Sequence, residues 1–196
     1  MIYIIRHGQT ELNNAHVLQG RSDYPLNENG IAQALKAGRW LMDQGIVFSH
    51  VYSSPLKRAI QTAELVAPRK PILIDDRLIE MDYGPYEGMD LSNPAPEITT
   101  FFSDFVNNPA PKGMEPLSEV VQRMGAFLET VKELPGNILI STHAIAMKGA
   151  LEYLTPESNG SYWSKYIGNC AVYAAKNMDG MIGVPEEVEY VRGSKR

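Results

Sequence analysis

The sequence predicts an α/β fold, a three-layer sandwich in which helices flank a mostly parallel central sheet. Short continuous apolar runs recur along the chain, and such runs are typical of strands buried on both faces. Longer segments with apolar residues at helical spacing alternate with these runs, which favours parallel strands joined by helices. A chain of 196 residues with 44% hydrophobic residues has enough apolar surface for a packed core. We therefore expect residues 1–196 to form one domain.

The expected strands are the runs rich in isoleucine, valine and aromatic residues, which suit an extended backbone. In chain order they span residues 2–5, 46–52, 71–74, 138–140 and 170–175. A last edge strand is expected at 188–191, before the basic residues 192–196.

The expected helices span residues 28–44, 55–67, 117–134 and 144–154, with a shorter one at 97–106. Asn27 is a candidate N-cap for the first helix, and Gly45 follows its last residue. Pro55 stands at the first position of the second helix, where a missing N–H is tolerated. The sequence Pro135-Gly136-Asn137 ends the third helix.

Residues 84–116 hold six of the 13 prolines and are interpreted as a lid over the main sheet. Phe101, Phe102 and Phe105 lie in its helix, and we interpret them as core packing rather than as a substrate cage. The polar and aromatic segment 158–168 is interpreted as a surface excursion.

Composition excludes several classes of protein. Eighteen Lys and Arg against 23 Asp and Glu give a formal charge of -5, which argues against nucleic acid or an anionic membrane as a partner. The single Cys170 excludes an internal disulfide and a cysteine-based zinc knuckle. No apolar run approaches the roughly 18 residues of a membrane span. The apolar N-terminal run is too short for a signal peptide, so we expect a cytoplasmic protein.

Polar clusters directly follow three of the expected strands, at residues 6–8, 53–58 and 141–143. Because ligands of an open α/β sheet bind beyond the carboxyl ends of its strands, these clusters should meet at one edge. They would bring together Arg6, Arg58, His7 and His143. Arginines fork onto phosphate oxygens, and the N–H groups of helix starts add donors, so the sequence predicts a phosphate site. No metal site is expected, since no histidine pair stands at i,i+4 and cysteine clusters are lacking.

The same residues resemble the motifs of the histidine phosphatase superfamily, which includes the cofactor-dependent phosphoglycerate mutases. Five motifs match in the family's order, and together they cover residues 1–175. They are Arg6-His7-Gly8-Gln9-Thr10-Glu11-Leu12-Asn13, Gln19-Gly20-Arg21-Ser22-Asp23-Tyr24-Pro25-Leu26, Ser53-Ser54-Pro55-Leu56-Lys57-Arg58-Ala59, Arg77-Leu78-Ile79-Glu80 with Gly84 and Glu87-Gly88, and Ser141-Thr142-His143 with a later Asn169.

The resemblance implies a role for each matching residue. His7 would be the nucleophile that forms a phosphohistidine, and Glu80 would donate a proton to the leaving oxygen. The phosphoryl oxygens would be held by Arg6, Arg58 and a protonated His143, with a further contact from Asn13. The mouth of the site would be formed by Gln19, Gly20 and Arg21.

Two positions depart from the family pattern. Ala144 follows the second histidine where glycine is common, so it adds a methyl group beside the phosphate. Lys148 stands where arginine is common, and we expect it to face away from the chemistry.

Histidine attacks phosphorus only through an unprotonated nitrogen, so an acceptor must hold the proton on the other nitrogen. The carbonyl of Gly8 or of a neighbour is the expected acceptor. Two arginines and one protonated histidine would oppose the charge of the phosphoryl group, so neither a metal nor another cofactor is expected.

The resemblance leaves three hypotheses about function. The first is a metal-independent phosphatase acting on a small phosphorylated metabolite, favoured because the lid is short. The second is a phosphoglycerate mutase, with 2,3-bisphosphoglycerate as cofactor, or a specialist for sugar phosphates or ribazole phosphate. The third is an inactive phosphate-binding module, against which the intact set of His7, Arg6, Arg58, Glu80 and His143 argues.

Overall fold

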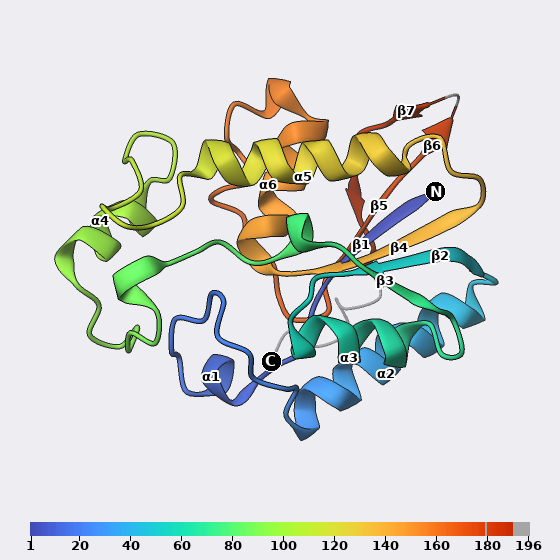
Figure 1. Cartoon of the computed structure of the whole chain (residues 1–196), viewed down its shortest axis with the longest axis horizontal. Coiled ribbons are helices and arrows are strands. Elements are labelled where there is room, and N and C mark those ends of the chain that lie inside the picture. Colours follow the sequence, from blue (N-terminus) through green and yellow to red (C-terminus); the bar gives the residue numbers. More distant parts are fainter. Residues whose placement is uncertain (179, 190–196) are drawn as a thin grey trace.

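The structure is a computed structural model that describes residues 1–178 and 180–189 (Figure 1). A six-stranded sheet runs through its centre in the order β3-β2-β4-β1-β5-β8. The first four of these strands are parallel, and β5 and β8 are antiparallel to their neighbours. The strands are β1 (Ile2–Arg6), β2 (Phe48–Ser53), β3 (Ile72–Ile74), β4 (Asn137–Thr142), β5 (Val172–Ala175) and β8 (Glu186–Glu187). A separate hairpin consists of β6 (Asn177–Met178) and β7 (Met181–Ile182).

Helices cover both faces of the sheet, which confirms the predicted three-layer α/β fold. Figure 1 shows α5 and α6 on one face and α2 and α3 on the other. The helices are α1 (Glu11–Asn14), α2 (Glu28–Asp43), α3 (Lys57–Val66), α4 (Pro96–Ser103), α5 (Leu117–Val131) and α6 (Ala144–Leu154). Short 3₁₀ turns are η1 (Asp76–Leu78), η2 (Gly84–Tyr86) and η3 (Pro156–Ser158).

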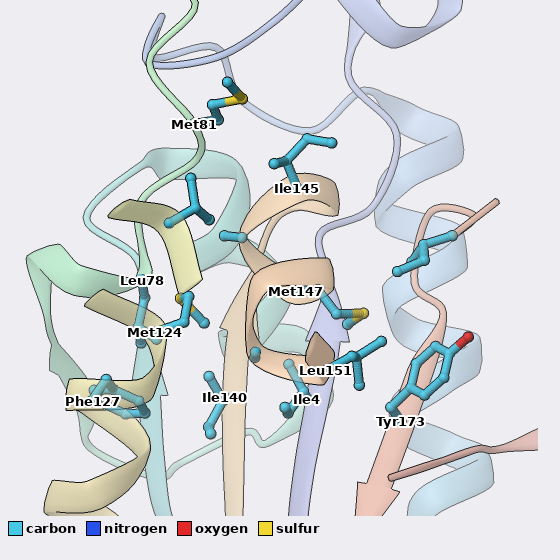
Figure 2. Packing of buried hydrophobic residues seen from close by; sticks show 14 of the residues in the cluster. Ile4, Leu78, Met81, Met124, Phe127, Ile140, Ile145, Met147, Leu151 and Tyr173 are labelled. Carbon is cyan, nitrogen blue, oxygen red and sulfur yellow. The ribbon is translucent and has the colours of Figure 1, made fainter. Parts of the chain in front are cut away.

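The two faces of the sheet carry separate apolar clusters. Alternate residues of a strand point to opposite faces, so Ile2 and Ile4 of β1 join one cluster and Tyr3 and Ile5 the other. Figure 2 shows the first cluster, in which strand residues such as Ile4 and Ile140 pack against Met124 and Phe127 of α5 and Met147 and Leu151 of α6. Burial on both faces explains why these strands read as continuous apolar runs.

Several predicted boundaries shift because local hydrogen bonds end or delay an element. Helix α3 begins at Lys57 rather than at Pro55, since Ser53 still belongs to β2 and Ser54 Oγ accepts the N–H of Leu56 at 3.3 Å. Helix α4 ends at Ser103 because Asp104 accepts the N–H groups of the residues that follow, at 3.0 and 3.1 Å.

The late strands also differ from the prediction. Strand β5 begins at Val172, because Cys170 has a left-handed backbone with φ of 56°. The edge strand β8 lies earlier than expected, and the N–H of Val188 donates to Val172 at 2.9 Å. Of the predicted strand 188–191 and the basic residues after it, positions 190–196 lie outside the described residues.

The segment 158–168 is not the surface excursion that its polar composition predicts. Trp163 and Ile167 are 7% and 3% exposed and belong to the same apolar cluster as α5 and α6. The phenylalanines of the lid pack inward as expected, since Phe101 is buried and its ring centroid lies 4.8 Å from that of Phe105. Phe105 in turn lies 6.3 Å from Trp163, so the lid rests on this segment.

Helices α1 and α4 lie beyond the end of the sheet where β1 finishes (Figure 1). Helix α1 has only four residues and was not predicted. None of the helices in the described ranges is both long and apolar enough to cross a membrane.

Candidate active site

Three chain segments meet where the parallel strands β1, β4 and β2 end. The N–H of His7, directly after β1, donates to Thr142 of β4 at 2.9 Å. The N–H of Ser54, directly after β2, donates to Ser141 of β4 at 3.0 Å. This pairing brings the predicted histidines together, with the ring centroids of His7 and His143 only 5.1 Å apart.

Hydrogen bonds on both ring nitrogens fix the tautomer of His7. Nδ1 lies 2.7 Å from the carbonyl oxygen of Gly8, which only accepts, so Nδ1 carries the proton. This contact confirms the predicted acceptor. On the other side of the ring, Nε2 accepts the Nε–H of Arg58 at 3.3 Å. Burial and the charges of Arg58 and Arg6 hold the pKa of His7 well below 6.5, so the lone pair on Nε2 is available at neutral pH.

Arg58 is a fully buried cation that is also held by two backbone carbonyls. Its two terminal nitrogens donate to Ser22 at 2.7 Å and to Gly20 at 2.6 Å. Burial lowers the pKa of Arg58 to about 10, so it remains charged at neutral pH.

Arg6 reaches the same region from the last position of β1. Its Nη1 donates to the carbonyl of Ile167 at 2.5 Å, and burial lowers its pKa. In the part of the chain that the structure describes, neither Arg6 nor Arg58 forms an ion pair with a carboxylate. A fully buried and a partly buried cation without an anionic partner favour the binding of an anion.

Unsatisfied polar atoms concentrate in the same place. Among the described residues, six buried side-chain polar atoms have no hydrogen-bond partner. Four of the six belong to the candidate site, namely Arg6 Nε, Gln19 Nε2, Ser22 Oγ and His143 Nδ1. Buried polar groups are normally paired, so this cluster of unpaired atoms is typical of a binding site.

His143 lies against Ser54, with Nε2 2.7 Å from Ser54 Oγ, and its side chain is fully buried. Without a bound anion, burial and the charge of Arg58 hold the pKa of His143 well below 6.5. The predicted protonated ring belongs to the state with a phosphoryl group bound and stays a prediction. A phosphoryl dianion beside the ring would raise that pKa again.

Glu80 lies on the loop after η1, with 3% of its surface exposed. Its oxygens accept the N–H groups of Ile145 at 3.2 Å and of Ala146 at 3.0 Å, at the start of α6. The N–H of Met81 donates to the same carboxylate at 2.9 Å. Because α6 begins directly after His143, this contact places Glu80 beside the second histidine. Ala144 is the first residue of α6 and lies in the chain between His143 and Ile145, whose N–H Glu80 accepts.

The remaining predicted site residues lie around this centre. Asn13 Oδ1 accepts from Asn169 at 3.3 Å, and the same Asn169 nitrogen donates to the carbonyl of His7 at 3.1 Å. Gln19 is buried, and its oxygen accepts from the hydroxyl of Thr10 at 2.7 Å. Gly20 contributes its carbonyl to Arg58.

Arg21 lies at the surface of the site, with 43% of its side chain exposed. It pairs with Asp82 at 3.0 Å and with Glu115 at 3.5 Å, and the structure gives it no contact with His7 or Arg58. Lys148 is buried, and its Nζ donates to Trp163 at 2.6 Å and lies over the ring of Phe105. It is near the site, since burial and the charges of Glu80 and Arg6 act on its pKa, which burial lowers to about 8.

The sequence did not indicate several groups that the structure brings into the site. The carbonyls of Ser22 and Ile167 bind the two arginines, and a backbone carbonyl has no signature in the sequence. The hydroxyl of Ser54 contacts His143 in addition to accepting the N–H of Leu56 before α3. Tyr83 is buried with the charge of Glu80 nearby, and burial raises its pKa well above 10.

Across residues 1–178 and 180–189, no three or more His, Cys, Asp or Glu side chains gather in a way that would hold a metal ion.

Comparisons with known proteins agree with this geometry. Residues 2–182 match the family model described as histidine phosphatase superfamily (branch 1). A probable phosphoglycerate mutase, GpmB, from Yersinia pestis (strain Pestoides F) is 35% identical over 154 residues, which cover 74% of this chain and 70% of that relative.

Solved structures are similar over almost the whole chain. YhfR from Bacillus stearothermophilus has a TM-score of 0.80 at 28% identity, covering 93% of this chain and 94% of its own. A phosphoserine phosphatase mutant from Entamoeba histolytica in complex with phosphoserine has a TM-score of 0.78 at 25% identity, covering 96% and 94%. The chain therefore belongs to the histidine phosphatase superfamily (branch 1) and is an enzyme.

Proposed function

We propose that the protein hydrolyses phosphate monoesters of small metabolites through a phosphohistidine formed on His7. The observation that carries this proposal is the tautomer of His7, whose proton is held on Nδ1 by Gly8 while Nε2 faces the buried Arg58, with the charge of Arg6 also acting on the ring. A neutral imidazole nitrogen beside unpaired cations is suited to attack a phosphorus atom whose oxygens the cations hold.

In the first half-reaction the Nε2 lone pair attacks phosphorus, and the bond from phosphorus to the ester oxygen breaks. Arg6, Arg58 and His143 bind the three phosphoryl oxygens, with Asn13 as a further contact. Arg58 Nε–H turns from Nε2 to a phosphoryl oxygen as the substrate enters, which frees the lone pair. Positioning and charge supply most of the catalysis in such a transfer.

Glu80 is the proton donor in this scheme. In its protonated form it gives the proton to the leaving alkoxide, and the resulting carboxylate then takes a proton from the attacking water. That water breaks the bond from phosphorus to Nε2 and releases inorganic phosphate, so Glu80 and His7 return to their starting states. The location of Glu80 at the start of α6, next to His143, supports this role.

The arginines supply the positive charge that a metal ion provides in other phosphoryl-transfer enzymes. We therefore propose that the reaction needs neither a metal nor another cofactor. The mouth residues Gln19, Gly20, Arg21 and Ala144 would contact or limit the remainder of the substrate.

Hydrolysis is favoured over mutase activity by the lid. A mutase has to protect the phosphoenzyme from water while the product reorients in the site. The segment 84–116 carries one helix of eight residues, α4, which is a small cover for that task. The similarity to a probable phosphoglycerate mutase makes isomerisation the alternative to test.

The test is to incubate the protein in EDTA with a panel of phosphate monoesters that includes phosphoserine, p-nitrophenyl phosphate and 3-phosphoglycerate with a trace of 2,3-bisphosphoglycerate. We expect free phosphate from one or more esters and no 2-phosphoglycerate. Isomer without free phosphate would make the protein a mutase. Binding of phosphate without either product would make it a binding module, and loss of turnover in EDTA would contradict metal independence.

A further inference from the structure

The loop of residues 20–22 lies between two charged side chains, one on each side of its backbone. On one side is Glu87, whose carboxylate accepts three consecutive N–H groups. Both of its oxygens lie 3.0 Å from the nitrogen of Gly20, and the nitrogens of Arg21 and Ser22 donate at 3.3 and 3.2 Å. Successive N–H groups that converge in this way form an anion-binding concavity, which here holds a side chain of the same chain.

The carbonyl groups of the same loop point to Arg58. Gly20 and Ser22 accept its two terminal nitrogens at 2.6 and 2.7 Å. The third nitrogen, Nε, donates to Nε2 of His7 at 3.3 Å. A continuous series of hydrogen bonds therefore leads from the carboxylate of Glu87 through the loop and Arg58 to the attacking nitrogen.

The loop packs on Glu87 without spare room. A Cβ atom added at Gly20 would lie 2.6 Å from Oε2 of Glu87 and 2.7 Å from the carbonyl oxygen of Met81. Glu87 is itself fixed by its backbone, since its N–H donates to Gly84 at 3.3 Å and the next residue, Gly88, donates to Leu18 at 2.9 Å. The carboxylate is thus held in a fixed place, from which it accepts the N–H groups of the loop.

From this arrangement we propose that Glu87 is a positioning residue of the active site, holding the loop 20–22 so that its carbonyls orient Arg58 against His7. The proposal rests on the phosphatase function proposed above for the step that Arg58 assists. Glu87 touches no reacting atom in this account.

The physical reason is that a buried guanidinium has to be held by acceptors, and here the acceptors sit on a loop. With an amide in place of the carboxylate, an NH2 donor replaces one of the two acceptor oxygens, so the three N–H groups are no longer all satisfied and the two carbonyls are held less firmly. Arg58 would then lose the orientation that aims Nε at His7 and at an incoming phosphoryl oxygen.

The variant Glu87→Gln removes the charge with almost no change in shape, and Glu87→Asp keeps the charge on a shorter side chain. We expect kcat/KM for p-nitrophenyl phosphate to fall by about 10- to 100-fold in Glu87→Gln, the range seen when supporting residues of a site are removed. The loss should be smaller in Glu87→Asp. The opposite order, with Glu87→Gln near wild type and Glu87→Asp impaired, would show that only the volume of the side chain matters and would overturn the proposal.

The matched control is Glu119→Gln, which makes the same substitution at an exposed position in the first turn of α5. It should leave kcat/KM within twofold. The Tm of each variant is measured to confirm that it is folded. A double-mutant cycle then combines Glu87→Gln with Arg58→Ala. If Glu87 acts through Arg58, Glu87→Gln should cause less than a twofold further loss in the Arg58→Ala background; a full additional loss would contradict the proposed series of contacts.

A readout without catalysis separates this inference from the proposed function. In ¹⁵N-arginine-labelled protein, the buried Nε–H of Arg58 should exchange slowly with solvent in the wild type and in Glu119→Gln, much faster in Glu87→Gln, and at an intermediate rate in Glu87→Asp. Unchanged protection in both Glu87 variants would overturn the positioning role even if the wild type is a phosphatase. Faster exchange would support it even if the wild type hydrolyses none of the esters tested.

Discussion

Each ring nitrogen of His7 has its own hydrogen-bond partner. Gly8 holds the proton on Nδ1, and Arg58 points an N–H at the lone pair of Nε2. Burial, together with the positive charges of the arginines, lowers the pKa of both histidines and favours their neutral form, in which one ring nitrogen keeps its proton. An anion is the ligand that relieves this arrangement, because it pairs the cations and restores a favourable environment for a protonated His143.

Glu80→Gln tests the proposed proton donor at the scale of one carboxyl group. We expect it to slow hydrolysis of alkyl phosphates by about 100- to 10,000-fold, the usual contribution of a general acid. Hydrolysis of p-nitrophenyl phosphate should fall much less, since its leaving group hardly needs a proton. The measurement is kcat on both esters. Equal losses would indicate that Glu80 acts only by capping α6 through Ile145 and Ala146.

The side chains of the site were predictable from the sequence, whereas the backbone groups were not. Arg6, His7, Arg58 and His143 follow three strands of one parallel sheet, so their meeting point depends only on the topology. The carbonyls of Gly20, Ser22 and Ile167 depend on how two loops fold back over the arginines, and any residue type can supply a carbonyl.

At the scale of elements, the loop that carries His7 is held by the start of α2. Gly8 and Gly30 approach so closely that a Cβ on Gly8 would collide with the backbone of Gly30, and one on Gly30 with the backbone of Gln9. Asn27 caps this helix by accepting the N–H of Gly30 at 2.8 Å, as predicted. The glycines therefore set the distance between α2 and the nucleophile.

Gly30→Ala should disturb both stability and activity, because its methyl group has no space between α2 and the loop. We expect a loss of about 1–3 kcal/mol in unfolding free energy, as for other overpacked positions, together with a lower kcat. Urea denaturation and p-nitrophenyl phosphate kinetics check the two effects. Gly183→Ala is the control, since the nearest atom to its added Cβ is 3.7 Å away. A Gly30→Ala protein as active and stable as this control would contradict the account.

Element types were predicted better than element ends. The apolar run of β1 and the helical periodicity of α5 follow from burial, which the sequence pattern records. The ends depend on single hydrogen bonds, such as those that Asp104 accepts after the last turn of α4. They also depend on left-handed backbone conformations such as that of Cys170, which only the tertiary fold imposes. Segment 158–168 was misjudged because only Trp163 and Ile167 are buried among its polar residues, which is too few to form a pattern.

At the scale of the whole molecule, the buried histidines link stability to pH. The pKa values of His7 and His143 lie well below 6.5 in the folded protein, while both return to about that value on unfolding. Below pH 6.5 the unfolded chain therefore binds more protons than the folded one, so the free energy of unfolding decreases as the pH is lowered. Each histidine costs about 1.4 kcal/mol per pH unit until its folded-state pKa is reached.

Urea denaturation at pH 7.5 and at pH 5 measures this linkage. We expect the wild type to lose stability on acidification, and the double variant His7→Ala with His143→Ala to lose clearly less. The exposed His16 provides the control, since His16→Ala should keep the wild-type dependence. A double variant with the full pH dependence would show that carboxylates elsewhere cause the loss.

The central claim, a phosphohistidine on His7, is tested most directly by trapping the phosphoenzyme. The protein is mixed with a phosphate monoester, quenched within the first turnovers in alkali, where a phosphorus–nitrogen bond to histidine survives, and digested for mass spectrometry. We predict one phosphoryl group on the peptide that contains His7, and neither label nor turnover in His7→Ala. A phosphoryl group on another residue, or full turnover by His7→Ala, would contradict the account.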